Sequence, residues 1–170
     1  MPVYLFTYHA YRSWMPDHPG GFVQQGRGVQ SPSAALANVY RQAATFPPVD
    51  FDDELQRLLI DHSIDICRRR RWRLHAVATE PTHLHILVSW TGSRRWQEVR
   101  GKLRNLLSLG LTRRFKQKGR PWFSTGASRK QVRTRAHFEH LMNKYLPNHG
   151  GARWFESRGW VTQSRPSGRG

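Results

Sequence analysis

Three segments have the alternating or β-branched, aromatic pattern that predicts strands. The first is Val3–His9, and the other two are residues 72–79 and 82–90. Glu80-Pro81 separates the second segment from the third and is typical of a turn. Because their connection is so short, the second and third strands are expected to lie antiparallel beside each other.

Three longer segments have helical periodicity. Asp52 is a candidate N-cap for a helix that runs to about Arg70, and Ser93 is a candidate N-cap for a helix over residues 94–118. Thr134 precedes a third helix, which is expected to continue past Tyr145 and to end near Gly150-Gly151. The apolar stripes comprise Leu55, Leu58, Leu59, His62 and Ile66 in the first helix, Trp96, Val99, Leu103, Leu106, Leu107 and Phe115 in the second, and Phe138, Leu141, Met142 and Tyr145 in the third.

The rest of the chain has weak periodicity. Residues 10–50 are rich in Gly, Pro, Ser and Gln and predict a long loop excursion, with one short helix over Ala34–Gln42. Residues 121–126 and 130–133 could pair as a hairpin. Residues 161–170 form a polar, Gly/Ser/Arg-rich tail that is expected to be disordered. The pattern predicts one α/β (α+β) domain over residues 1–160, a central antiparallel sheet with packed helices.

The net charge of the chain says more about its partners than its length does. The 170 residues include 28 Lys and Arg against 11 Asp and Glu, which gives a net charge of +17. Such an excess favours nucleic acid as the partner, with an anionic membrane surface second. No apolar run is long enough for a membrane span, the N-terminus lacks a signal-peptide pattern, and Cys67 is the only cysteine. We expect a cytoplasmic protein associated with a prokaryotic nucleoid.

The basic residues are concentrated after residue 90. The helix expected over residues 94–118 carries nine Lys and Arg, with Glu98 as its only acidic residue. A solvated helix face is the usual role of such residues, but this imbalance favours contacts with phosphates. The candidate nucleic-acid contacts are Arg94, Arg95, Arg104, Arg129, Lys130, Arg133 and Lys144.

His83 and His85 flank Leu84 within the third predicted strand. Side chains alternate along a strand, so both imidazoles are expected on one face, with Leu84 and Ile86 on the other. Two imidazoles at that spacing can bind one divalent metal ion, while the opposite face packs on the core. A lone His-x-His is a weak signal, because most such histidines are structural.

Four segments together resemble a known family, the HUH single-strand nucleases, and within it the single-tyrosine transposases of small insertion sequences and REP-associated elements. The resemblance runs from about residue 3 to residue 160. The segments are Phe6-Thr7-Tyr8-His9-Ala10-Tyr11-Arg12-Ser13-Trp14-Met15-Pro16, Glu80-Pro81-Thr82-His83-Leu84-His85, Trp122-Phe123-Ser124-Thr125-Gly126-Ala127-Ser128 and Asn143-Lys144-Tyr145-Leu146-Pro147-Asn148-His149. One departure is Thr82, where many members have Asn.

The resemblance implies a ferredoxin-like HUH nuclease fold and a site. Tyr145 matches the family's nucleophile, and His149 matches the third metal ligand beside His83 and His85. The implied cofactor is a divalent metal ion, Mg²⁺ or Mn²⁺, of which Mn²⁺ suits imidazole better. Pro147 lies between Tyr145 and His149 and removes a helical hydrogen bond, so Asn148 is an alternative ligand.

The implied function is that of a metal-dependent transposase or recombinase that cleaves and rejoins single-stranded DNA through a covalent 5′-phosphotyrosine. The implied partners are single-stranded or hairpin DNA and a second copy of the chain in a homodimer, with no membrane. A non-catalytic protein that binds single-stranded nucleic acid, derived from a transposase, is the alternative. A zinc hydrolase with the three histidines as ligands is a third possibility, although the sequence offers no evident carboxylate base. If Tyr145 only packs, then Tyr8, Tyr11 or Tyr40 would have to be the nucleophile.

Overall fold

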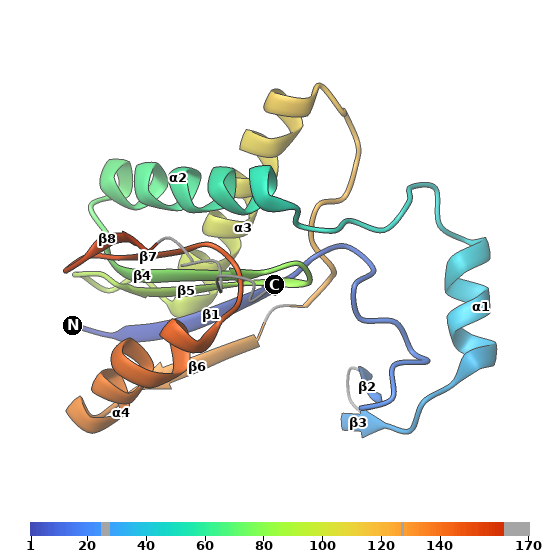
Figure 1. Ribbon diagram of the computed structural model, residues 1–170, viewed down its shortest axis with the longest axis horizontal. Helices are drawn as coiled ribbons and strands as arrows, with labels where there is room; N and C mark the ends of the chain where they lie inside the picture. Colours follow the sequence, from blue (N-terminus) through green and yellow to red (C-terminus); the bar gives the residue numbers. More distant parts are fainter. Residues whose placement is uncertain (25–27, 127, 162–170) are drawn as a thin grey trace, which may run out of the picture.

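A six-stranded antiparallel sheet forms the centre of the protein. The computed structural model describes residues 1–24, 28–126 and 128–161. The strands lie in the order β6-β1-β5-β4-β7-β8 (Figure 1). Their bounds are β1 Val3–His9, β4 Arg73–Glu80, β5 His83–Ser89, β6 Ser128–Val132, β7 Arg153–Phe155 and β8 Gly159–Val161. The predicted α/β class and central antiparallel sheet are confirmed, and β5, which carries the two histidines, lies inside the sheet between β1 and β4.

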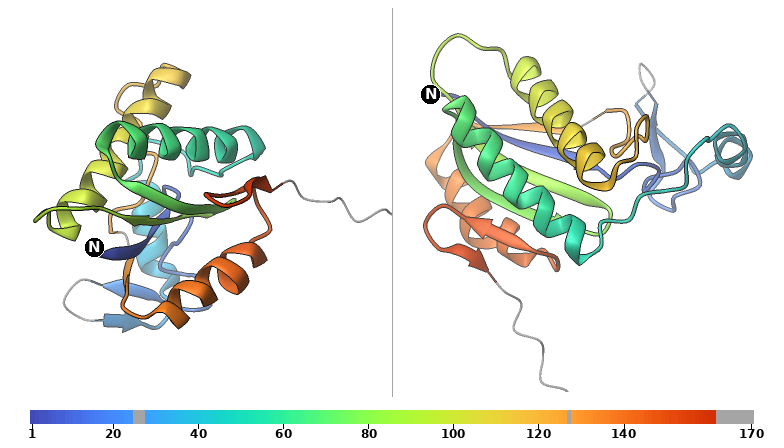
Figure 2. Two further views of the ribbon diagram at one scale, coloured as in Figure 1. Left: turned by 90° about the vertical axis from the view of Figure 1, so that its left-hand side faces the viewer. Right: turned by 90° about the horizontal axis from the view of Figure 1, so that it is seen from above.

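The connectivity is that of a ferredoxin-like unit. Strand β1 is followed by α2 (Asp53–Arg70), then by β4 and β5, then by α3 (Trp96–Phe115) and β6. Helices α2 and α3 cover one face of the sheet, and α4 (Arg135–His140) lies across the other (Figure 2). The chain continues from α4 into a π-helical turn, η1 (Leu141–Tyr145), and a 3₁₀ turn, η2 (Leu146–Asn148).

Alternation along the strands divides the buried side chains between the two faces. The cluster under α2 and α3 includes Phe6, Leu84, Ile86 and Leu103. The cluster under α4 is smaller and includes Leu87. His85 lies on this second face, because it is separated from Leu87 by two positions along β5. The predicted orientation of β5 is therefore confirmed.

Helix caps account for two of the three predicted helix starts. Asp52 Oδ1 accepts a hydrogen bond from Leu55 N–H at 2.8 Å, and Thr134 caps α4. The predicted Ser93 cap is wrong, because α3 begins only after Arg95, which makes no side-chain capping bond. The Trp90 indole donates to the Arg94 carbonyl at 3.0 Å and bridges the loop that precedes α3.

The predicted hairpin between residues 121–126 and 130–133 is wrong. Strand β6 pairs with β1, so that Lys130 lies opposite Leu5. Of residues 121–126, Phe123 forms an isolated bridge to Ala10. A distant strand with unpaired backbone groups therefore outcompetes the local partner, which periodicity within one segment cannot reveal.

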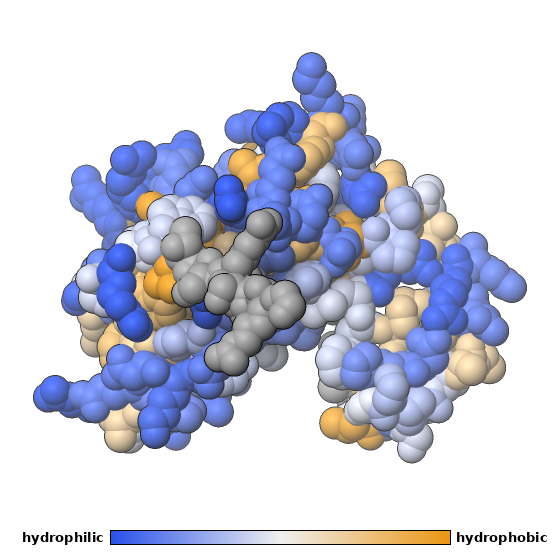
Figure 3. Space-filling view, viewed as in Figure 1, coloured by the Kyte–Doolittle hydropathy of each residue, from blue (hydrophilic) through white to orange (hydrophobic). Residues whose placement is uncertain are grey.

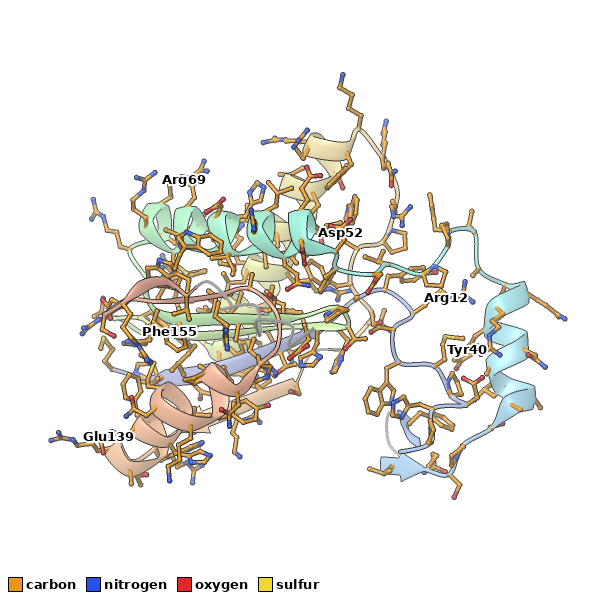
Figure 4. All side chains as sticks on the ribbon, viewed as in Figure 1. Arg12, Tyr40, Asp52, Arg69, Glu139 and Phe155 are labelled. Carbon is orange, nitrogen blue, oxygen red and sulfur yellow. The ribbon has the colours of Figure 1, made fainter. Side chains whose placement is uncertain are left out.

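The excursion over residues 10–50 stands beside the sheet (Figure 1). It contains helix α1, Ala34–Gln42 as predicted, and a small hairpin of β2 (Phe22–Gln24) and β3 (Gly28–Gln30) that the sequence did not indicate. Its two ends meet where Val49 N–H donates to the Tyr11 carbonyl at 2.9 Å. Arg12, at the junction in Figure 4, has a left-handed φ of 61° and donates to the Phe46 carbonyl. The excursion is thus closed at its base.

At the C-terminus, β8 includes Val161, which we expected in a disordered tail, and residues 162–170 lie outside the described part of the chain. Among the described helices, none has both the length and the apolar character to cross a membrane. Hydrophilic side chains cover much of the face in Figure 3, with small apolar patches between them.

Candidate active site

His83 and His85 begin β5 and project from the face that α4 and η1 cover. Thr7 Oγ1, on the neighbouring strand β1, lies 2.8 Å from His85 Nδ1. Thr82 Oγ1 lies 2.9 Å from His83 Nδ1. A hydroxyl can accept from an imidazole N–H, and a neutral ring protonated at Nδ1 has its lone pair on Nε2. Each threonine therefore orients one imidazole and supports Nε2 as its ligand atom.

The helix that carries Tyr145 does not end as an α-helix. Leu146 N–H donates to the Leu141 carbonyl, five residues back, and this is a π-helical bond. Pro147 has no N–H to donate, and the chain then tightens into the 3₁₀ turn η2. His149 follows with extended backbone angles (φ −70°, ψ 138°). The expectation that Tyr145 and His149 share an unbroken helix face is wrong.

The irregular end nevertheless brings the two side chains together. The His149 N–H bonds to the Leu146 carbonyl at 3.4 Å, so it does not occupy the Tyr145 carbonyl. That carbonyl lies 3.0 Å from His149 Nδ1. A carbonyl can only accept, so Nδ1 must carry the proton, and the lone pair of neutral His149 is on Nε2. The tautomer suited to a ligand is thus fixed by the backbone.

Three imidazoles converge from two distant parts of the chain. One ligand nitrogen from each of His83, His85 and His149 lies within 4.8 Å of the other two. The ring centroid of His85 is 4.7 Å from that of His83 and 4.6 Å from that of His149. We call these three residues the histidine cluster. Asn148, the alternative ligand, is exposed to solvent.

Burial favours the neutral form of His83 and His85 by lowering their pKa values. The pKa of His85 is lowered to about 3, chiefly by burial and further by the neighbouring His149, His83 and His9. The pKa of His83 is also lowered, chiefly by burial and then by His149 and His9, with Glu80 opposing. Neutral imidazoles are the form that binds metals.

The donor set fits a divalent transition metal. Three imidazoles whose Nδ1 atoms lie beside hydroxyl or carbonyl oxygens form the usual arrangement of metal-binding histidines and their supporting groups. Mg²⁺ prefers oxygen ligands, whereas imidazole suits Mn²⁺ and the later metals. His83, His85 and His149 could therefore hold a cation, and the chemistry of the nitrogens favours Mn²⁺ over Mg²⁺.

Tyr145 directs its hydroxyl at this cluster. The Tyr145 oxygen lies 3.4 Å from His85 Nε2, and the residue is 39% exposed. Partial burial raises the pKa of its phenol. The other candidate tyrosines are placed differently: Tyr8 is buried under α3 with its hydroxyl on the Arg100 carbonyl, and Tyr40 lies on α1 (Figure 4).

A buried polar clasp fixes the segment after His149. Gln56 Oε1, on α2, accepts hydrogen bonds from Thr79 Oγ1 and from Ala152 N–H. Gly151 N–H donates to the Thr79 carbonyl, and a Cβ on Gly151 would lie 2.2 Å from both that oxygen and Gln56 Oε1. Only glycine allows this close approach. The clasp therefore fixes the segment that directly follows His149 and so limits where His149 can lie.

Three residues at the site were missed by the sequence reasoning. Thr7 orients His85, and Glu80 accepts from Gly150 N–H, so a carboxylate does lie near the cluster. His9 pairs with His83 across β1 and β5, with ring centroids 5.9 Å apart. These neighbours follow from the register between β1 and β5, which lie some 75 residues apart in the sequence. No local sequence pattern indicates that register.

The candidate DNA-binding residues fall into two groups. Lys130 lines a hollow of about 240 Å³ beside Tyr145, and Lys144 is exposed on η1. Arg129 lies on the other face of β6, with its guanidinium 4.0 Å from the centre of the Trp96 ring. Arg94, Arg95 and Arg104 belong to α3 or its approach, and Arg133 follows β6 and contacts Gln131. The first two residues are near the site, and the α3 group is not brought to it.

Comparison with known proteins shows the fold. No protein-family model and no curated protein sequence matches the chain. The crystal structure of a "putative transposase" from Deinococcus radiodurans R1 is similar over 88% of this chain and 91% of that one, with a TM-score of 0.50 and 15% identity. A REP-associated tyrosine transposase bound to a REP hairpin is similar over 85% of this chain and 64% of that one, with a TM-score of 0.49 and 12% identity.

The chain therefore shares its fold with the first of these two structures, over most of both chains. This architecture agrees with the fold that the resemblance in the sequence implies.

Proposed function

We propose that this chain is a divalent-metal-dependent enzyme that cuts and rejoins single-stranded DNA, with Tyr145 as the nucleophile. The observation that carries the proposal is the position of the Tyr145 hydroxyl, 3.4 Å from His85 Nε2 in the histidine cluster. A nucleophile beside a metal-binding group is the arrangement that phosphodiester transfer needs.

The chemistry follows from the side chains. When bound by His83, His85 and His149, a divalent cation supplies positive charge to the phosphate oxygens and to the leaving oxygen. The Tyr145 oxygen attacks phosphorus, loses its proton to solvent, and becomes joined to the 5′ side of the break. The bond from phosphorus to the 3′ oxygen breaks, and that oxygen gains a proton. One phosphodiester is exchanged for another, so the reverse reaction can rejoin the strand.

The electrostatics of Tyr145 make this reaction conditional. Burial raises the pKa of its phenol above the ordinary value of about 10, so the side chain alone is protonated at neutral pH. Positive charge beside the oxygen favours the phenolate. The absence of cleavage without divalent ions is therefore part of the proposal.

A single strand suits the surroundings of Tyr145. The hollow beside it lies between β1, β6 and α4 and is lined by Thr7, Lys130, His137 and His140, among others. A positively charged hollow that opens onto the nucleophile can follow a flexible backbone, whereas a duplex cannot bend into it. Salt should weaken binding, since counterions are released.

A labelled single-stranded oligonucleotide incubated with Mn²⁺ tests the proposal. Denaturing electrophoresis should show a shortened strand and a covalent protein–DNA adduct. Tyr145→Phe keeps the ring and removes the oxygen, so the adduct and the cut should vanish while binding persists. Tyr40→Phe is the matched control and should behave like the parent. An adduct from Tyr145→Phe at the parental level would refute the assignment of the nucleophile.

The rival function is a binding protein that holds single-stranded nucleic acid without cutting it. The rival predicts the same binding and salt dependence with no adduct under any metal. A homodimer remains an expectation of the family resemblance, and sedimentation of the intact chain tests it.

A further inference from the structure

A stacked aromatic pair, an exposed Trp14 and a half-buried His18, lies near the histidine cluster on the excursion. Trp14 and His18 stack with ring centroids 3.7 Å apart and planes 20° apart. Trp14 is 45% exposed, which is unusual for so large an aromatic side chain. Packing in the core does not explain the pair, because neither residue belongs to the buried clusters of the described chain.

The pair is held rigidly. The Trp14 indole donates to the Gly21 carbonyl at 2.9 Å, and His18 Nδ1 accepts from Gly20 N–H at 3.0 Å. Gly21 has a φ of 77°, and a Cβ there would lie 2.3 Å from the Gln30 carbonyl oxygen, so the turn that carries the indole's acceptor requires glycine. An exposed indole with a fixed orientation loses little conformational entropy when it binds a flat ligand.

The residue before Trp14 contacts the turn that leads into β5, the strand that carries His83 and His85. Ser13 Oγ lies 2.9 Å from the Ala10 carbonyl and 3.0 Å from the Thr82 carbonyl, and its one proton can be donated to either or shared between them. Thr82 directly precedes His83. The ring of His9 neighbours both sites, with its centroid 5.9 Å from that of the His83 ring and 5.9 Å from that of the Trp14 ring. The centroid of the Trp14 ring is thus at most 5.9 Å plus 5.9 Å from that of the His83 ring.

Exposed indoles and imidazoles stack on nucleobases whatever the sequence, because every base has a π face. A single strand whose phosphate reaches the cluster can bring a neighbouring base to the face of the Trp14 ring. The other strongly exposed aromatic rings, Tyr40 on α1 and Trp160 on β8, have no ring contact with the cluster among the described residues.

We propose that the Trp14–His18 pair is a stacking platform for one unpaired base of the single strand, next to the phosphate that Tyr145 attacks. The inference rests on the proposed function, since it assumes single-stranded DNA in the site. It assigns Trp14 and His18 as positioning residues, which hold the strand and do not touch the reacting atoms.

Binding to two strands that differ only in their bases tests the platform. The probes are an oligothymidine of about 12 nucleotides and an abasic strand of equal length, and EDTA prevents cleavage. Stacking acts on the first probe only, whereas phosphate contacts act on both. Trp14→Leu should weaken binding of the oligothymidine by roughly 5- to 150-fold and leave the abasic strand unchanged. Trp14→Phe, which keeps an aromatic face, should restore most of the loss.

Trp160→Leu is the control, because Trp160 is similarly exposed, at 42%, but lies on β8. This variant should bind both probes with the affinity of the parent protein. If circular dichroism shows that Trp14→Leu is unfolded, His18→Leu replaces it as the test. This variant keeps the indole and should still lower the ratio of the affinity for oligothymidine to the affinity for the abasic strand. A parental preference in the folded variant, or an equal loss on both probes, overturns the platform and leaves the proposed function standing. If the parent protein binds neither strand, the proposed function fails as well.

Discussion

The carbonyl oxygen of Tyr145 accepts a hydrogen bond from Nδ1 of His149, at 3.0 Å. The candidate nucleophile and the candidate third ligand are therefore joined through the backbone of one and the side chain of the other. This bond is possible because the π turn and Pro147 leave that carbonyl without a helical donor. A regular α-helix would have satisfied it with the His149 N–H.

His149→Ala should lower the affinity for Mn²⁺ by at least tenfold, because one of three nitrogen ligands is lost. Asn148→Ala is the matched change at the neighbouring exposed position and should alter the affinity less than twofold by this reasoning. Calorimetric titration with Mn²⁺ measures both. A larger loss in Asn148→Ala than in His149→Ala would show that the wrong residue has been assigned.

Thr7→Val should weaken Mn²⁺ binding by about 10- to 100-fold without removing a ligand, because the Nδ1 atom of buried His85 loses its partner. Val keeps the shape of Thr, so the effect isolates the hydroxyl. Stability should also fall, by about 1–3 kcal/mol. Thr82→Val makes the same change at the less buried His83 and should cost less in both measurements. Parental Mn²⁺ affinity in Thr7→Val would remove Thr7 from the site.

Gly151→Ala should destabilise the protein by about 1–3 kcal/mol, because its Cβ would collide with the Thr79 carbonyl and with Gln56 Oε1. Gly101→Ala is the control: its Cβ meets nothing within 4 Å inside α3, and it should stabilise by about 0.5–1 kcal/mol. Urea unfolding of both variants measures the change in the free energy of unfolding, which should be negative for Gly151→Ala and positive for Gly101→Ala. Equal stabilities would mean that the clasp yields easily and does not position His149.

Cys67 should resist thiol reagents in the native protein. It is 1% exposed on α2, and burial raises the pKa of its thiol to about 12, so the reactive thiolate is scarce at pH 8. Labelling with a chromogenic disulfide should be slow in buffer and rapid in urea. Fast stoichiometric labelling of the native chain would contradict the packing of α2 on the sheet.

The fold was predictable where local patterns carry it. The strand Val3–His9, the helix Ala34–Gln42 and the cap at Asp52 coincide with the observed elements. The pairing of β6 with β1 was not, because residues 121–133 contain their own plausible hairpin. The choice between a local and a distant partner depends on tertiary packing.

The site was predictable in its members and not in its geometry. The orientation of His83 and His85 follows from strand alternation, and the resemblance pointed to Tyr145 and His149. The helical spacing offered for the last two was wrong, since a π turn and a 3₁₀ turn join them. Pro147 signalled an irregular end, but a sequence does not say which way the chain turns afterwards.

The closed base of the excursion has a consequence for how such a protein can diversify. Since Tyr11 and Val49 already hold its ends together, lengthening or replacing the segment changes the loop-closure entropy only logarithmically and leaves the sheet intact. The excursion can therefore be replaced as a unit. A different segment between β1 and α2 would change the surface beside the histidine cluster and leave the residues of the cluster in place.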